Sequence, residues 1–172
     1  RRKGDRLVLE SSQAEITALR VVLAIGKSGA SRRLGVPGEH LPHVFNRLFD
    51  PGEFQDLDIL VVGGGDTALE AATGLAEAGN RVTLSYRGEE MSRPKEENLD
   101  RFEAMVKRGR IVPIYRSKVR EVREKETVLQ TDHEPKVVKS DRVFTFIGRE
   151  PPLAFFKRSG IRMAGAKDRA WY

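Results

Sequence analysis

The sequence predicts an α/β fold built around a parallel β-sheet, and three consecutive features carry this prediction. Residues 58–62 (DILVV) form a short apolar run typical of a strand that is buried on both faces. A glycine-rich turn and an amphipathic segment follow directly, and the apolar run 81–85 (RVTLS) comes next. A strand, a turn, a helix and a second strand form a βαβ unit, whose crossover makes the two strands parallel.

Composition limits the class of protein. The chain has 172 residues, of which 39% are hydrophobic, enough for the core of one ordinary domain. Its net charge of +6 suits an anionic partner, such as a nucleotide, a nucleic acid or an acidic protein. Because it has no cysteine, disulfides, thiolate metal sites and dithiol redox centres are excluded within these residues. No long apolar run and no secretory signal are visible, so we expect no membrane association and a cytoplasmic location.

The first segment predicts two strands, at residues 6–10 and 19–25, separated by polar residues 11–13. Two strands alone cannot make a core, so we expect the chain to start within a larger fold. After Gly26, glycine, proline and basic residues crowd together, which is typical of a loop between domains.

The turn after residue 62 is a G-x-G-x-x-A motif formed by Gly63, Gly65 and Ala68. Gly63 would permit the tight turn, Gly65 would let the backbone approach a pyrophosphate, and the small Ala68 would let helix and strand pack closely. The phosphates would meet free N–H groups and the positive end of the helix dipole. Glycine turns also arise for structural reasons alone, but the complete βαβ context favours dinucleotide binding. Gly79 is expected to end the helix.

The end of the second strand indicates which dinucleotide is favoured. An NAD site offers a carboxylate there for the ribose 2′-hydroxyl, whereas an NADP site offers cations for the 2′-phosphate. Here Arg87 follows the strand, with Arg93 and Lys95 close behind, although each could belong to a solvated loop. Glu89 and Glu90 either repel a phosphate or face solvent and pair with the arginines.

The remaining chain continues a Rossmann-like three-layer fold, a parallel sheet with an antiparallel β side layer. Ser92 is expected to cap a helix over 93–108 that Gly109 ends. Further strands are expected at 111–115, 119–124, 128–131 and 143–147, with a hairpin turn at 124–127 and a surface excursion at 132–139. The histidines (His40, His43 and His133) lack partners at metal-ligand spacing, so no metal site is predicted.

The stretches VVGGGDTALEAA and VTLSYRGEEMSR resemble the NADPH domain of thioredoxin-reductase-like flavoproteins. The flanks agree: residues 17–26, the LGVPGE run at 34–39 and the FTFIGREP run at 144–151 resemble the places where the family's chain leaves and re-enters its flavin domain. The resemblance covers about residues 6–155. It implies that NADPH passes a hydride to FAD, and that two domains rotate about crossings at 26–37 and 148–152.

The chain also departs from the thioredoxin reductase pattern. The C-x-x-C pair that precedes the glycine motif in those enzymes is absent from residues 43–58. In the arginine segment, Tyr86 stands for a histidine, Gly88 replaces the second arginine, and Arg93 lies one position late. The chain therefore resembles the dithiol-free branch, which includes ferredoxin–NADP reductases and bacillithiol-reductase-like proteins.

This resemblance implies four regions: strands left from an FAD domain at 1–33, an interdomain linker at 34–57, an NAD(P)H-binding domain at 58–148 and a return linker at 149–172. Trp171 and Tyr172 would be a fragment of the continuing flavin domain. The expected function is that of the NADPH-binding domain of a flavoprotein oxidoreductase, with FAD held by a domain absent from these residues, so that this chain alone is inactive. The alternative is a non-catalytic dinucleotide-binding sensor or regulatory module.

The expected cofactor-binding residues fall into four groups, and no residue is expected to act as a catalytic group. Glu70 is expected near the nicotinamide end, unless it faces solvent. The other groups are the pyrophosphate loop (Gly63, Gly64, Gly65, Asp66, Thr67 and Ala68), the 2′-phosphate clamp (Arg87 and Arg93) and the return crossing (Ile147 and Gly148).

Expected partners are the dinucleotide, the FAD domain, an unidentified electron acceptor and, as an option, a second copy of the chain, with no nucleic acid.

Overall fold

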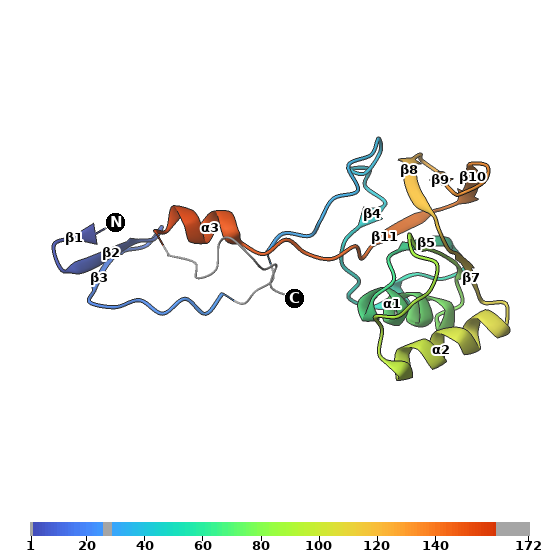
Figure 1. Cartoon of the computed structure of the whole chain (residues 1–172), viewed down its shortest axis with the longest axis horizontal. Helices are drawn as coiled ribbons and strands as arrows, with labels where there is room; N and C mark the ends of the chain where they lie inside the picture. The colour runs from blue at the N-terminus through green and yellow to red at the C-terminus, as the bar shows by residue number, and fades with distance from the viewer. Residues whose placement is uncertain (1, 26–28, 161–172) are drawn as a thin grey trace. The chain divides into compact units, whose positions relative to one another are not determined.

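The computed structural model describes residues 2–25 and 29–160 (Figure 1). The chain divides into two units, the first made of residues 1–29 and 151–172 and the second of residues 30–150. The features expected at Gly26, Trp171 and Tyr172 lie outside the described residues.

The described residues of the first unit form a small antiparallel sheet and one short helix. Its strands are β1 (Arg2–Lys3), β2 (Arg6–Glu10) and β3 (Glu15–Ala18), in the order β1-β2-β3, and its helix is α3 (Leu153–Arg158). The strand predicted at 19–25 is therefore wrong, because the second strand of the hairpin lies earlier. The Ser11 hydroxyl accepts the N–H groups of Gln13 and Ala14, and this tight turn pairs the residues just after it with β2.

The second unit is built on a five-stranded sheet in the order β4-β11-β5-β6-β7, in which every neighbouring pair is parallel. The predicted parallel α/β sheet is therefore confirmed. Strands β5 and β6 have the predicted bounds, while β7 and β11 are each slightly shorter than expected. The strands are β4 (Val44–Phe45), β5 (Asp58–Val62), β6 (Arg81–Ser85), β7 (Ile111–Ile114) and β11 (Arg142–Thr145).

Two helices cover one face of this sheet, α1 (Asp66–Glu77) and α2 (Glu96–Lys107) (Figure 1). Side chains alternate along a strand, so β5 sends Ile59 and Val61 into the helix-facing core and Leu60 and Val62 into the opposite core. Phe102 of α2, 1% exposed, packs in the helix-facing core. The short apolar run at β5 is thus explained by burial on both faces.

An antiparallel sheet covers the other face, which completes the predicted three layers. Its strands are β8 (Lys118–Val122), β9 (Glu126–Gln130) and β10 (Lys136–Lys139), in the order β10-β9-β8. The surface excursion predicted at 132–139 is therefore only partly correct, since its second half is β10. Val138 of that strand is buried in the second core, and this burial stabilises the segment as a strand.

The segment 34–57, expected as a linker between domains, is instead part of the second unit. Its strand β4 extends the parallel sheet beside β11. The Phe45 ring stacks on Phe144 of β11 at 5.2 Å between centroids, and the Phe54 ring meets Phe144 edge-on at 5.3 Å. A two-residue strand is too short to show a hydrophobic period, which explains why the sequence pattern missed it.

The chain enters and leaves the second unit through two adjacent segments. Ser31 and Arg149 form an antiparallel bridge, the Arg32 N–H donates to the Gly148 carbonyl at 3.0 Å, and the Glu150 N–H donates to the Ala30 carbonyl at 2.9 Å. These paired segments lie within the regions where the crossings were expected.

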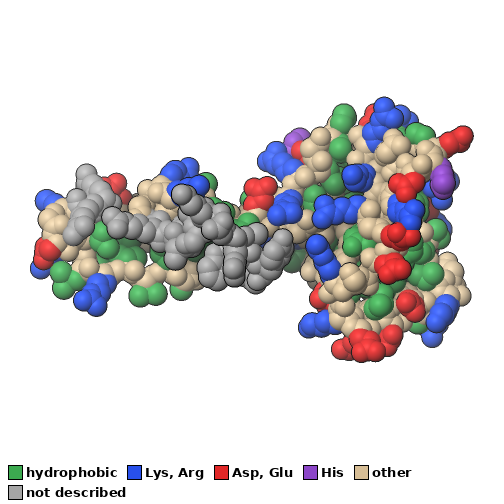
Figure 2. Space-filling model, in the orientation of Figure 1, with side chains coloured by type: hydrophobic (Ala, Val, Ile, Leu, Met, Phe, Trp, Pro, Cys, Tyr) green, Lys and Arg blue, Asp and Glu red, His purple; other side chains and the backbone are tan. Residues whose placement is uncertain are grey.

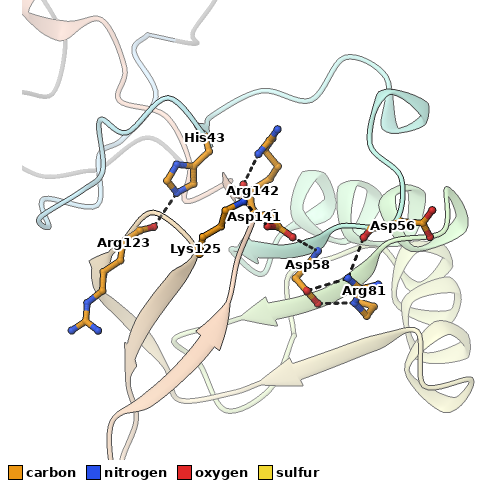
Figure 3. A network of polar contacts seen from close by, with 8 residues as sticks. All are labelled: His43, Asp56, Asp58, Arg81, Arg123, Lys125, Asp141 and Arg142. Atoms are coloured by element: carbon orange, nitrogen blue, oxygen red, sulfur yellow. Dashed lines mark hydrogen bonds and ion pairs between the residues drawn. The ribbon is translucent and has the colours of Figure 1, made fainter.

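A polar network joins the amino ends of the parallel strands (Figure 3). The Arg81 guanidinium donates twice to the Asp58 carboxylate, at 2.7 and 3.1 Å. The Asp141 carboxylate accepts the Asp58 N–H at 3.0 Å and the Lys125 ammonium at 3.1 Å. The hydrogen bond from Arg81 lowers the pKa of Asp58, and the bonds from the Asp58 N–H and Lys125 lower the pKa of Asp141. Since this edge is opposite the glycine turn, the network supports the sheet rather than the candidate site.

We expect Asp141→Ala to lower the free energy of unfolding by about 1–2 kcal/mol at pH 7, because it leaves the Asp58 N–H without its charged acceptor. The folded-state pKa of Asp141 lies below its ordinary value of 3.8, so the unfolded chain binds the proton more readily. The contribution is therefore present above pH 3.8 and is lost as the pH falls through the folded-state pKa. Urea denaturation at pH 7 and at strongly acidic pH measures both effects.

Glu124→Ala is the matched control, because Glu124 is exposed and makes no ion pair with any residue of 2–25 or 29–160. Equal losses of stability in the two variants at pH 7 would contradict a specific role for Asp141.

Candidate functional site

The candidate site lies at the carboxyl ends of the parallel strands, where the strand order reverses. From β5 the chain continues through β6 to β7 on one side, whereas β11 lies on the other side of β5. Open α/β sheets bind ligands in the crevice at such a switch point. The residues that follow β5, β6 and β11 all reach this edge, and they include most of the predicted cofactor-binding set.

The three glycines after β5 have different structural surroundings. A β-carbon at Gly63, whose φ is +147°, would lie 2.5 Å from the Phe146 carbonyl oxygen. A β-carbon at Gly64 would lie 2.3 Å from the Tyr86 ring. A β-carbon at Gly65 would meet no heavy atom within 4 Å. The fold itself therefore requires the first two glycines, while the third faces open space.

That open space lies at the amino end of α1. Gly65 is the N-cap of this helix, with φ −113°, and no side chain caps its first N–H groups. The Ala68 N–H donates to the Gly65 carbonyl at 2.9 Å, so the N–H groups of Asp66 and Thr67 are the orphan donors at the positive end of the helix dipole, which is the arrangement that suits an anion. The small Ala68, 1% exposed, lies in the first turn, and its β-carbon is 3.0 Å from the position that a β-carbon at Gly63 would take. Thr67 is exposed beside it.

Asp66 and Glu70 bind the start of α2. The Asp66 carboxylate accepts the Lys95 N–H and the Asn98 amide, both at 2.8 Å, and Glu70 accepts the same Asn98 amide at 2.9 Å. The bond from the Lys95 N–H, followed by that from Asn98, lowers the pKa of Asp66. These two carboxylates thus join α1 to α2, a role that the sequence pattern did not indicate.

The same contacts explain where α2 begins. The helix starts at Glu96 with Lys95 as its N-cap, so the prediction that Ser92 caps a helix from residue 93 is wrong. Arg93 directly precedes Pro94, and a proline disfavours helical geometry at the residue before it, so Arg93 stays outside the helix.

The two arginines predicted to bind a 2′-phosphate, Arg87 and Arg93, are both exposed. Neither forms an ion pair with any residue of 2–25 or 29–160. Glu89, which could have paired with them, instead pairs with Arg116. The last residue of β6 is Ser85 and not a carboxylate. Its buried hydroxyl hydrogen-bonds the Ser117 hydroxyl at 2.8 Å.

The residues after β11 approach the glycine turn from its other side. The Phe146 N–H donates to the Val62 carbonyl at 2.7 Å, which fixes this segment beside the end of β5. Ile147 is partly buried against the second core, and Gly148 has a φ of +93° with open space where a β-carbon would lie. The structure therefore places Gly63 directly against Phe146, the residue before the predicted pair Ile147 and Gly148.

A cavity of about 400 Å³ was missed by the sequence interpretation. It opens beside the ends of β4 and β11, and the basic pair at 32–33 is the one signal that could have indicated it. Glu39 accepts the Gly35 N–H at 2.8 Å, and its carboxylate lies 3.3 Å from the His40 Nε2 within this region. The lining residues are Ala30, Ser31, Arg32, Arg33, Leu34, Glu39, His40, Val44, Phe45, Asn46 and Thr145.

The surface charges of the second unit are mixed. On the face drawn in Figure 2, Lys and Arg side chains alternate with Asp and Glu side chains over this unit and do not form one basic stripe. Nucleic-acid-binding surfaces concentrate cations on one face or along one helix. Among residues 2–25 and 29–160, no group of three His, Asp or Glu side chains could hold a metal ion. None of the helices described is long and apolar enough to cross a membrane.

The five-stranded parallel sheet and its glycine turn define the class of protein, a three-layer, Rossmann-like α/β protein. A family model described as pyridine nucleotide-disulphide oxidoreductase matches residues 1–171. The chain belongs to this family. Members of the family bind FAD and NAD(P)H.

Two curated relatives match nearly the whole chain. "Bacilliredoxin reductase Bdr" of Bacillus subtilis is 31% identical over 172 residues, which cover 99% of this chain and 53% of the relative. "Ferredoxin--NADP reductase" of Ignicoccus hospitalis is 35% identical over 172 residues, which cover 95% of this chain and 55% of the relative. The chain therefore spans about half the length of these relatives.

Solved structures match the fold. Bacillithiol disulfide reductase Bdr from Staphylococcus aureus superposes with a TM-score of 0.86 at 28% identity, covering 91% of this chain and 49% of that one. Thioredoxin reductase of Lactococcus lactis superposes with a TM-score of 0.79 at 23% identity, covering 95% of this chain and 55% of that one, a likeness of fold alone. These matches confirm the resemblance to thioredoxin-reductase-like flavoproteins that the motifs indicated.

We expect Gly63→Ala and Gly65→Ala to differ sharply in stability. The first should lower the free energy of unfolding by about 2 kcal/mol or more, because its β-carbon meets the Phe146 carbonyl at a φ that disfavours side chains. The second should cost less than about 1 kcal/mol, because it changes only an N-cap preference. Urea denaturation of both variants provides the measurement, and similar losses would contradict the different surroundings of the two glycines.

Proposed function

We propose that residues 30–150 form the NADPH-binding domain of an FAD-dependent oxidoreductase. NADPH supplies a hydride and FAD accepts it, with the flavin held by a domain outside these 172 residues. The observation that carries the proposal is the open space at Gly65 in front of the uncapped start of α1, beside two glycines that the fold itself requires.

In this proposal the pyrophosphate binds at the turn of Gly63, Gly64 and Gly65. The orphan N–H groups of α1 donate to its oxygens, and the helix dipole favours its charge. Asp66 and Glu70 stabilise the position of α1 against α2 through Asn98, and their carboxylates are held by these bonds. Their function is therefore to orient the turn, a change from the direct cofactor contacts expected from the sequence.

The preference for NADPH over NADH rests on the end of β6. The last residue of β6 is Ser85, which is buried and bound to Ser117, and Tyr86 follows it, so the strand end does not offer the carboxylate that would bind a ribose 2′-hydroxyl. Arg87 and Arg93 are free of ion pairs with the described residues, so their guanidinium groups can bind a 2′-phosphate without first breaking a salt bridge.

The first unit is proposed to belong to the flavin-binding part of the protein. The paired segments at 30–32 and 148–150 would then be the connection between the two domains. Ile147 and Gly148, which begin the return segment beside the glycine turn, would contact the dinucleotide on the side away from Arg87.

Isothermal titration of the 172-residue chain with NADPH and with NADH tests this function. We expect NADPH to bind at least about tenfold more tightly than NADH. Arg87→Ala should lose roughly 1–3 kcal/mol of binding free energy for NADPH alone, because it removes a charged hydrogen-bond donor. Arg120→Ala, an exposed arginine on β8 without an ion pair among the described residues, should leave both affinities unchanged.

Gly65→Ala tests the pyrophosphate turn. Since its fold should be nearly as stable as that of the parent, a weaker affinity for both nucleotides would reflect the β-carbon in the proposed phosphate site. If neither nucleotide binds to the parent chain at millimolar concentration, or if Gly65→Ala binds both unchanged, the proposed function is wrong.

A further inference from the structure

The loop that carries Arg87 is held in place by residues that follow β7. The Tyr86 N–H donates to the Ile114 carbonyl, the Ser117 N–H donates to the Tyr86 carbonyl, and the Arg116 N–H donates to the Gly88 carbonyl, each at 3.0 Å. The ends of β6 and β7 are therefore joined beyond the last paired residues of the two strands.

Arg116 has an unusual backbone conformation within this connection. Its φ is +48°, in the left-handed region that non-glycine residues rarely adopt. A residue kept in this region requires compensating contacts, and such residues concentrate at functional sites. The hydrogen bond to Gly88 and the contacts of the side chain supply that compensation.

The Arg116 side chain lies between two carboxylates from different parts of the chain. It pairs with Glu89 in the loop after β6, and with Asp132 after β9 at 3.4 Å. The hydrogen bond and the charge of Glu89 raise the pKa of Arg116. All three side chains are about half exposed or more, so the pairs contribute little to the stability of the fold.

The consequence concerns the proposed phosphate site. Glu89 lies two residues beyond Arg87, and an unpaired carboxylate there would repel a 2′-phosphate and compete for the guanidinium of Arg87. The pair with Arg116 engages that carboxylate and offsets part of its charge.

We infer that Arg116 is a positioning residue for dinucleotide specificity: by pairing with Glu89 it keeps this carboxylate from Arg87 and Arg93, so that both can bind the 2′-phosphate of NADPH. This role rests on the proposed function. It explains how Glu89, two residues beyond Arg87, can be present in a loop that favours a phosphate.

A mutant cycle with titrations of NADPH and NADH at low salt tests this role. Arg116→Met, which removes the charge and retains much of the side-chain length, should weaken NADPH binding about fivefold, an effect of the size expected for an exposed charge near a phosphate. NADH affinity should stay within about twofold, because NADH lacks the phosphate. Added salt should reduce the NADPH defect.

Rescue distinguishes the inferred role from a structural one. Glu89→Gln combined with Arg116→Met should restore NADPH affinity to within about twofold of the parent, because no charge is left to shield. Asp132→Asn is the matched control, since it breaks the other ion pair of Arg116 without exposing Glu89, and it should leave both affinities unchanged.

Four outcomes overturn the inference. Equal weakening of NADPH and NADH by Arg116→Met would indicate loss of loop structure, and an NADPH defect that persists in the double variant would indicate that Arg116 binds the phosphate directly. Unchanged NADPH affinity in Arg116→Met, in a chain that prefers NADPH, would reject the role of Arg116 alone. A parent chain that binds neither nucleotide, or both equally, would reject the proposed NADPH preference and this role together.

Discussion

The second unit depends on a close approach between Gly63 and Phe146. The Gly63 backbone lies so near the Phe146 carbonyl oxygen that a β-carbon on this residue would come within 2.5 Å of it. This close approach is possible because β5 and β11 are parallel neighbours whose chains turn at the same edge of the sheet. It also brings the start of α1 over that edge, with Ala68 packed against the turn. Gly64 depends on a similar contact, since the ring of Tyr86 from the neighbouring strand occupies the position of its absent side chain. The geometry of the candidate site therefore follows from close contacts between the segments that follow β5, β6 and β11, one with a backbone carbonyl and one with an aromatic ring.

At this edge, three acidic side chains bond to other residues of the second unit, whereas two arginines do not. Asp66 and Glu70 bind Asn98, and Glu89 binds Arg116, so three carboxylates near the proposed dinucleotide site are already occupied. Arg87 and Arg93 have no comparable partner among the described residues. At the opposite edge of the sheet, Asp58 and Asp141 bind Arg81 and Lys125 and join the amino ends of the strands. The two edges thus differ in charge: the amino edge joins the strands through ion pairs, and the carboxyl edge carries the exposed arginines that the proposed function assigns to a phosphate.

The relatives carry names that refer to different redox partners, namely bacilliredoxin, ferredoxin and thioredoxin. A shared fold therefore does not decide the redox partner, which depends on other residues. This chain has no cysteine and still forms the sheet and its glycine turn, so neither of them needs a dithiol.

The sequence by itself determined the elements whose signals are local. The bounds of β5 and β6, the turn at Gly63 to Gly65 and the parallel connection between the strands all follow from apolar period and turn chemistry within a short stretch of chain. Tertiary structure decided what depends on partners far along the chain. Strand β4 exists because β11 lies beside it, β10 exists because β9 pairs with it, and Glu89 finds Arg116 because the ends of β6 and β7 are joined. Such pairings leave no periodic trace in a single segment, since their energy comes from contacts that only the folded chain brings together.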